Sequence, residues 1–97
     1  MKADYAPRAE ADLIEIAEYT RRTFGQAVSS ALEIYLQATV ARITAMPEIG
    51  EVVPDREGVR VVPLARYPFR IFYTIVRDTV TILHIRHTAR RPWQGDE

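Results

Sequence analysis

The sequence predicts an α+β fold in which two antiparallel helices cover one face of a small antiparallel β-sheet. Apolar residues recur at spacings of three and four between residues 7 and 24, and they nearly fill residues 26–46, as expected for two helices. The chain after residue 58 is rich in Val, Ile, Phe and Tyr, as expected for strands. Because only one or two residues around Gly25 separate the helices, we expect them to run antiparallel.

The first helix is expected from about Pro7 to Phe24. Pro7 suits a first turn, where its missing N–H loses no hydrogen bond, and Gly25 suits a left-handed stop. The apolar stripe is expected at Leu13, Ile16, Ala17, Thr20 and Phe24, and the acids Glu10, Asp12, Glu15 and Glu18 fall mostly in other sectors. Residues 1–5 are too short to assign, although a strand there would add usefully to the sheet.

The second helix, expected at residues 26–46, is apolar on most sides. Its polar residues form one narrow stripe, Ser30, Glu33, Gln37 and Thr44. Pro47 ends the helix. The first helix can cover only one side of this apolar surface, so a sheet is expected to cover another.

Turn-forming residues make residues 47–58 a loop, which we expect to be mobile. A β-meander follows over residues 59–88, in the segments VRVVPLAR, YPFRIFYTIV and TVTILHIRH. Pro63 is expected at an edge or a bulge. Arg77 and Asp78 are expected to form a tight hairpin turn, because Asp tolerates a left-handed conformation better than most residues. Residues 89–97 form a C-terminal tail.

The strand pattern predicts a sheet that is apolar on both faces. Tyr67, Phe69, Ile71, Tyr73 and Ile75 share one face of the penultimate strand, and Arg70, Phe72, Thr74 and Val76 share the other. In the last strand, Val80 and Ile82 are expected to oppose Leu83 and Ile85. Two helices can cover only one face, so a partly apolar face is expected to stay exposed unless a partner covers it. The alternative is that a central strand in a small sheet is simply apolar throughout.

The composition fits one globular domain spanning residues 1–97, with 47% hydrophobic and 27% charged residues. The absence of cysteine excludes disulfides, thiolate metal sites and cysteine nucleophiles. No apolar run approaches the roughly 20 residues that span a bilayer, and the acidic start MKADYAPRAEAD lacks the apolar core of a secretory signal. We therefore expect a cytoplasmic protein that does not bind a membrane.

Charge is divided unequally along the chain, although the formal net charge is zero. Residues 1–57 hold six cations and ten acids, a net charge of −4, and residues 58–97 hold seven cations and three acids, a net charge of +4. All cations except Lys2 are arginines. Arginine binds carboxylates and phosphates in a bidentate manner, so the C-terminal half is suited to an acidic partner. An ordinary mixed-charge surface is the alternative.

The residues that carry possible chemistry gather between Tyr67 and Arg90. His84 and His87 are three apart and point to opposite faces of a strand unless a bulge intervenes, so they cannot act as a pair, and one of them is expected to pack or to be hydrogen-bonded. They are also a poor ligand set for a metal. Arg70 can pair with a partner's acid, or with Asp55 or Glu57 of the loop. Arg86, Arg90 and Arg91 can form a solvated face, and Trp93 can be either a clamp on the domain or an interface anchor.

The ordered segments PRAEADLIEIAEY, MPEIG and VRVVPLARYPFRIFYTIVRDTVTILHIRHTARRPW resemble the RelE/ParE family of toxins from bacterial type II toxin-antitoxin systems. The resemblance covers nearly the whole chain, and HTARRPW is closer to the ParE-like branch. It implies a helix hairpin packed on an antiparallel sheet. It also implies a hetero-oligomer with a cognate antitoxin, expected to be of the ribbon-helix-helix type, whose C-terminal segment wraps the toxin.

The two branches of that family imply different residues. RelE-like toxins cut messenger RNA in the ribosomal A site, for which Arg70 would contact phosphate and His87 or Arg90 would complete the site, with His87 as acid or base. ParE-like toxins bind DNA gyrase and trap its cleavage complex without chemistry of their own. The chain lacks the lysines and the C-terminal catalytic tyrosine of RelE, and its pI of about 6.7 disfavours RNA binding.

We therefore expect a gyrase-directed toxin that is neutralised by an antitoxin. No catalytic residue, cofactor, metal or sequence-specific nucleic-acid binding is expected. The residues expected to contact the antitoxin or the target are Arg60, Arg70, Phe72, Arg86, His87, Arg90 and Trp93. The alternatives are a ribosome-dependent mRNA endonuclease and a binding module that has lost toxicity and only sequesters an antitoxin.

Overall fold

The computed structural model describes residues 1–88 and confirms the α+β fold class. The elements within this range follow the order β1 (Lys2–Tyr5), α1 (Pro7–Phe24), α2 (Gln26–Ala45), β2 (Glu51–Val52), β3 (Val59–Pro63), β4 (Phe69–Val76) and β5 (Thr79–His87). The helix α1 covers the residues expected to be helical, and α2 ends one residue earlier than expected. A strand does form near the N-terminus, and a two-residue strand interrupts the segment expected to be a loop.

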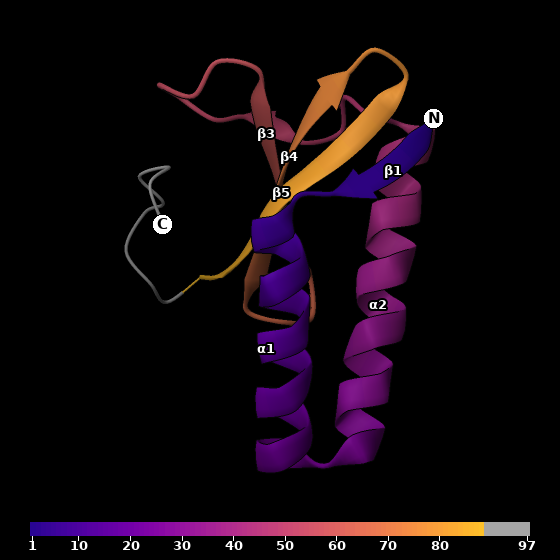
Figure 1. Cartoon of the computed structure of the whole chain (residues 1–97), viewed down its shortest axis with the longest axis vertical. Helices are drawn as coiled ribbons and strands as arrows, with labels where there is room; N and C mark the ends of the chain where they lie inside the picture. Colours follow the sequence, from indigo (N-terminus) through magenta and orange to yellow (C-terminus); the bar gives the residue numbers. More distant parts are fainter. Residues whose placement is uncertain (89–97) are drawn as a thin grey trace.

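The two helices form an antiparallel hairpin that lies in front of the sheet and projects past its end (Figure 1). Gly25 makes the turn between them with φ 96°, a left-handed value that residues with a Cβ seldom adopt. Its N–H donates to the Arg21 carbonyl at 2.9 Å and closes the last turn of α1. The turn at Gly25 lies at the end of the hairpin that projects past the strands (Figure 1).

The strands form one sheet in the order β1-β5-β4-β3-β2. Neighbouring strands are antiparallel except that β1 runs parallel to β5, with Lys2 opposite Thr79 and Tyr5 opposite Ile82. Because β1 ends there, the outer edge of β5 beyond Ile82 has no strand partner among residues 1–88. That uncovered edge is where the first helix is attached.

A β-bulge at Leu83 changes which residues of β5 share a face. Tyr73 of β4 lies opposite Ile82 and Phe72 lies opposite His84, so Leu83 is the extra residue. Ile85 therefore returns to the face that Ile82 occupies, whereas a regular strand would have put them on opposite faces. The expectation that Ile82 and Ile85 oppose each other is wrong for this reason.

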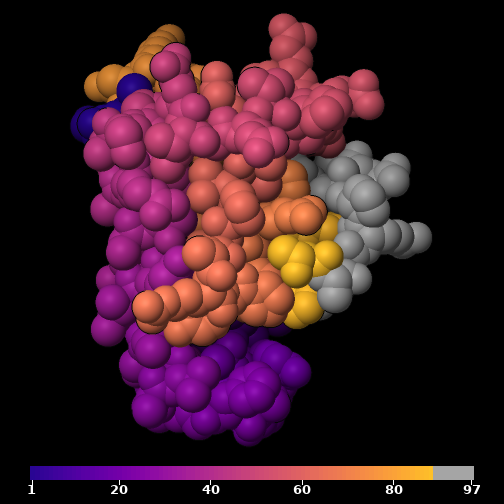
Figure 2. Space-filling model, turned by 180° about the vertical axis from the view of Figure 1, so that it is seen from behind, coloured from indigo at the N-terminus to yellow at the C-terminus, as the bar shows by residue number. Residues whose placement is uncertain are grey.

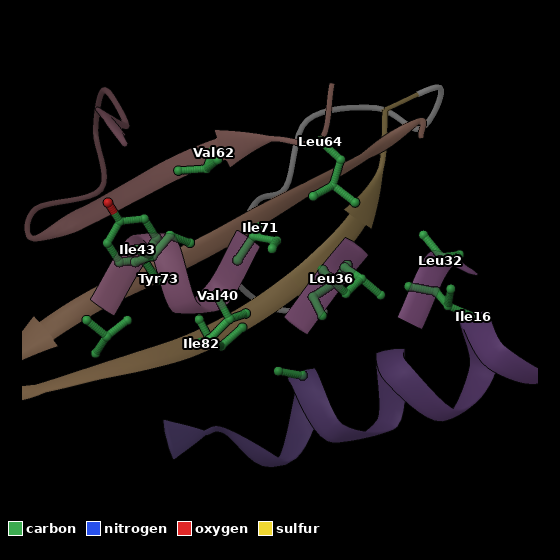
Figure 3. Packing of buried hydrophobic residues seen from close by; sticks show 13 residues of the cluster. Ile16, Leu32, Leu36, Val40, Ile43, Val62, Leu64, Ile71, Tyr73 and Ile82 are labelled. Atoms are coloured by element: carbon green, nitrogen blue, oxygen red, sulfur yellow. The ribbon is translucent and has the colours of Figure 1, made fainter. Parts of the chain in front are cut away.

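The hydrophobic core lies between the helices and one face of the sheet (Figure 3). Tyr73 and Ile71 of β4 point at α2, and Ile16 of α1 reaches Leu32 and Leu36. The buried members of this cluster are Ala9, Ile16, Leu32, Leu36, Val40, Ile43, Val62, Leu64, Ile71, Tyr73, Val80, Ile82 and Ile85. At about 25 cal/mol per Å² of apolar surface removed from water, this cluster is the main source of stability.

Hydrogen bonds hold part of the connection after α2 against the core. The buried hydroxyl of Tyr73 donates to the Pro47 carbonyl at 2.7 Å and accepts the Gly50 N–H at 2.9 Å. Arg60 Nη1 adds bonds to the carbonyls of Gly50, at 2.8 Å, and Glu48, at 3.3 Å. A Cβ at Gly50 would lie 2.6 Å from the Tyr73 hydroxyl oxygen, so only glycine fits this close approach.

The tight turn between β4 and β5 forms at the expected residues but with a different conformation. The left-handed φ, 59°, belongs to Arg77, whereas Asp78 has no positive φ. An L-residue other than glycine pays roughly 1–2 kcal/mol for this conformation. The asparagine or glycine that such a turn favours is therefore replaced here by a strained arginine.

Exposed apolar surface gathers on the helix hairpin more than on the face of the sheet turned away from the helices, here called the back face. On the back face Val76 is exposed, but Phe72 is only 8% exposed. The expectation of an open apolar sheet face is therefore met only in part. Of the exposed large apolar residues in the described range, half instead lie on the hairpin, namely Ile14, Tyr19, Phe24, Val28 and Ile34.

Candidate functional site

A groove of about 920 Å³ runs alongside α1. One wall is formed by α1 together with Val28 and Leu32 of α2, and the other by the segment between β3 and β4 together with the end of β5. In Figure 2, that segment (orange) lies next to the turn end of the hairpin (purple). Ile16, Ile85, Asp12 and His84 are buried and form the base, and the residues nearer the opening include Glu15, Glu18, Tyr19, Arg22, Phe24, Val28, Tyr67, Pro68, Phe69 and His87.

Aromatic rings dominate the opening of this groove. Tyr19 and Phe24 of α1 meet edge to face at 6.4 Å between centroids, and Phe69 meets the His87 ring edge to face at 5.4 Å. Tyr19 and Phe24 are both more than half exposed. Such rings offer large apolar area with few rotatable bonds, which is typical of protein-binding surfaces. The rim also carries the carboxylates Glu15 and Glu18.

A carboxylate from α1 joins the helix to the uncovered edge of β5 at the base of the groove. Asp12 Oδ2 accepts the Ile85 N–H at 3.0 Å and faces His84 Nδ1 at 2.5 Å. Asp12 Oδ1 accepts Arg8 Nε at 3.1 Å. Because an ionised carboxylate only accepts hydrogen bonds, the Nδ1 of His84 is the donor. Asp12 thus satisfies a backbone N–H that β1 would have bonded had it continued.

Burial raises the pKa of Asp12, but the hydrogen bonds from His84 and from the Ile85 N–H outweigh that effect, and the charge of His84 and the Arg8 bond act in the same direction. The net result is a pKa below the ordinary value for an aspartate. The carboxylate is therefore ionised near neutral pH.

The back face carries the arginines that the sequence singled out. Arg70 of β4 lies opposite Arg86 of β5, and in the next row Phe72 lies opposite His84 with their rings stacked at 6.2 Å and 24°. Arg70 is exposed, whereas Arg86 and Phe72 are buried. Within residues 1–88, Arg70 forms no ion pair with Asp55 or Glu57. Arg70 is therefore the back-face arginine that solvent reaches.

The structure separates the other residues that were expected to contact a partner. His87 lies opposite Phe69 on the helix side of the sheet, away from Arg70. Arg60 also lies on the helix side, where Nη1 holds the carbonyls of the connection after α2. His84 is 2% exposed, and its Nδ1 is hydrogen-bonded to Asp12. Arg90 and Trp93 fall outside the described residues.

Sequence reasoning missed Asp12 and the aromatic groove beside it. Asp12 is buried with Ala9, Ile16 and Thr20, so it belongs to the packed stripe of α1 rather than to the solvent sectors. The available signal was its spacing of three and four from apolar neighbours. An acid at such a position needs a buried partner, which here is 72 residues away in the chain.

The described part of the chain offers neither a metal centre nor a membrane span. Among residues 1–88, no three His, Asp or Glu side chains come together as metal ligands. Neither helix in this range is long and apolar enough to cross a bilayer.

The family is decided by a match to the model described as the ParE toxin of the type II toxin-antitoxin system parDE, over residues 3–92. The chain belongs to the ParE toxin family. It is a toxin of a type II toxin-antitoxin system. None of the curated proteins compared with this ParE-family chain matches it.

Solved structures show the same fold at low sequence identity. The chromosomal ParDE toxin-antitoxin system of P. aeruginosa matches with a TM-score of 0.78 and 23% identity, over 90% of this chain and 95% of that one. The intact E. coli RelBE toxin-antitoxin complex matches with a TM-score of 0.63 and 16% identity, over 93% of this chain and 98% of that one. The isolated E. coli RelE toxin also matches with 0.63, at 15% identity, over 93% and 86%.

Proposed function

We propose that this ParE-family toxin inhibits DNA gyrase by binding it, with no residue acting as a catalyst, and that a cognate antitoxin keeps it inactive in the cytoplasm. The observation that carries this proposal is the separation of Arg70 from His87. Arg70 projects on the back face and His87 lies on the helix side against Phe69.

That separation argues against the cleavage of RNA. Cutting a phosphodiester requires a proton-transfer group and a cation around the same phosphate, within hydrogen-bond reach of it. The remaining histidine, His84, shares the face of Arg70, but its ring is buried and its Nδ1 is engaged by Asp12. Within residues 1–88, neither histidine therefore comes together with the exposed Arg70 around one phosphate.

The groove beside α1 is the proposed docking site of the antitoxin. Its exposed aromatic side chains form an apolar surface that suits a binding partner. The acids Glu15 and Glu18 at its rim favour a basic residue on that partner. We propose that the occupant is an apolar C-terminal segment of a ribbon-helix-helix antitoxin, bearing a lysine or arginine near the α1 wall. Two solved structures with this fold come from toxin-antitoxin systems, ParDE and RelBE, and this supports an antitoxin partner.

The proposed surface for gyrase combines the helix hairpin outside the groove with the exposed arginine of the back face. Ile34 of α2 is 66% exposed and Ile14 of α1 is 61% exposed, and neither lines the antitoxin groove. Arg70 adds an always-charged bidentate group. Ile14, Ile34 and Arg70 all lie outside the set of residues that line the groove, so the two proposed contacts use different residues.

A supercoiling assay with matched variants tests this proposal. Wild-type chain added to gyrase and relaxed plasmid should stop supercoiling at near-stoichiometric concentration. The Arg70→Ala variant should need at least roughly tenfold more chain, equivalent to about 1.4 kcal/mol of binding. The Arg77→Ala variant, which removes an exposed arginine from the β4–β5 turn, should act like wild type. Unchanged supercoiling at a large excess of wild-type chain would refute the proposal.

A further inference from the structure

The hydrogen bond between Asp12 and His84 joins the two walls of the groove at its base. Asp12 belongs to α1, which carries Glu15 and Tyr19, and His84 belongs to β5, which carries His87. Both partners are less than 10% exposed, so neither offers its own surface to a ligand.

We propose that Asp12 and His84 are the positioning pair of the antitoxin groove: their bond sets the distance between α1 and β5, and the affinity for the antitoxin depends on it. This inference rests on the proposed function, because it assumes that the groove receives the antitoxin. The two residues act through the walls they hold, without touching the partner themselves.

The local fold makes α1 depend on this bond. Pairing with β1 stops at Ile82, so no strand from the described part of the chain supports the outer edge of β5 at the level of the groove. The bulge at Leu83 then turns His84 away from the core face, and it brings the Ile85 N–H to the free edge. A single carboxylate bonds both groups. A displacement of α1 at this point moves Tyr19, two helical turns further along, by a comparable amount.

Within residues 1–88, three groups bond the Asp12 carboxylate. Arg8 occupies Oδ1, and the Ile85 N–H and His84 Nδ1 share Oδ2. The His84 ring in turn stacks on Phe72, which fixes the plane of the imidazole. A donor placed one bond further from the backbone would therefore miss Oδ2. This geometric requirement makes it possible to distinguish a positioning role of His84 from a role in filling space alone.

Two substitutions of His84 exploit this requirement. In the His84→Asn variant, a side-chain nitrogen bonded to Cγ can take the place of Nδ1, so the bond to Asp12 is kept. In the His84→Gln variant, the nitrogen is bonded to Cδ and takes the place of the other ring nitrogen, so the bond is lost. Both variants lose the ring and its stacking on Phe72, which makes each the control for the other. Glu10→Gln, an exposed change on α1 outside the groove, should have no effect.

The test measures the affinity of the full chain for its co-encoded antitoxin by titration calorimetry, alongside urea unfolding to show that each variant is folded. We expect His84→Asn to bind within about threefold of wild type. His84→Gln and Asp12→Asn should bind at least about tenfold more weakly. Equal affinities of the two His84 variants, at matched folded fractions, would overturn the proposal.

Hydrogen exchange at the Ile85 amide gives a readout that does not need the antitoxin. Exchange should stay slow in wild type and in His84→Asn, and it should quicken in His84→Gln, while the amides in the centre of β4 keep their protection. A wild-type chain that binds no antitoxin would refute the proposed occupant of the groove. The amide exchange would then decide by itself whether the pair positions α1, and unchanged Ile85 exchange in His84→Gln would overturn that too.

Discussion

Removing one oxygen atom by Tyr73→Phe should release the connection after α2 from the core. The ring of Tyr73 is fully buried, and its hydroxyl makes two bonds, to the Pro47 carbonyl at 2.7 Å and from the Gly50 N–H at 2.9 Å. Each of these two hydrogen bonds contributes about 1 kcal/mol. An unsatisfied buried donor carries a penalty of about 1–3 kcal/mol, and the Gly50 N–H left without an acceptor adds part of that penalty. We expect a loss of about 2–3 kcal/mol in the free energy of unfolding.

Urea unfolding followed by far-ultraviolet circular dichroism measures this loss. The midpoint should fall with the slope unchanged, and the melting temperature should fall by roughly 10–20 °C for a domain of this size. The matched control is Tyr67→Phe, because Tyr67 packs its ring against Tyr35 and its hydroxyl makes no hydrogen bond that is found within residues 1–88. That control should change stability by less than about 0.5 kcal/mol. A Tyr73→Phe variant as stable as this control would refute the reasoning.

Three further predictions concern other single residues. Asp12→Asn should destabilise the chain at pH 7 by roughly 1–3 kcal/mol. Because the pKa of Asp12 is lowered on folding, this contribution to stability is present above the ordinary pKa of about 3.9 and is lost as the pH falls through the pKa of the folded state. If the unfolding free energies of wild type and variant stay equally far apart down to pH 3, the prediction is contradicted. Gly50→Ala should cost about 1–3 kcal/mol in urea unfolding, since the new Cβ would lie 2.6 Å from the Tyr73 hydroxyl oxygen, and an unchanged midpoint would show that the connection gives way freely. Arg77→Gly should raise the melting temperature by relieving the left-handed φ of 59°, with a gain of roughly 0.5 kcal/mol after the extra chain entropy of glycine, and a lowered melting temperature would contradict that.

The helices and strands could be predicted because their apolar spacing is strong and local. Gly25 and Pro47 mark the ends of helices by their own backbone preferences, and the two-residue turn at Arg77 and Asp78 follows from two β-prone runs on either side. The parallel pairing of β1 with β5 could not be predicted in the same way, since four residues carry no periodic signal.

The bulge at Leu83 was hidden because the segment TVTILHIRH is apolar at so many positions that alternation does not fix which residues share a face. The bulge affected the prediction of the site more than the prediction of the fold. The place of His84 on the back face depends on the bulge, and its bond to Asp12 joins residues 72 positions apart. Neither fact has a local signature, so the acid looked like one more solvent-facing residue of α1.

We propose that this ParE-family toxin acts on gyrase without chemistry of its own. The most direct test is to add the purified wild-type chain, in one series of concentrations, to a gyrase supercoiling reaction and to ribosomes translating a defined message. We expect supercoiling to stop while the message stays intact at every concentration. A message cut in the ribosomal A site, with cutting lost in Arg70→Ala and His87→Ala and with supercoiling unaffected, would contradict it.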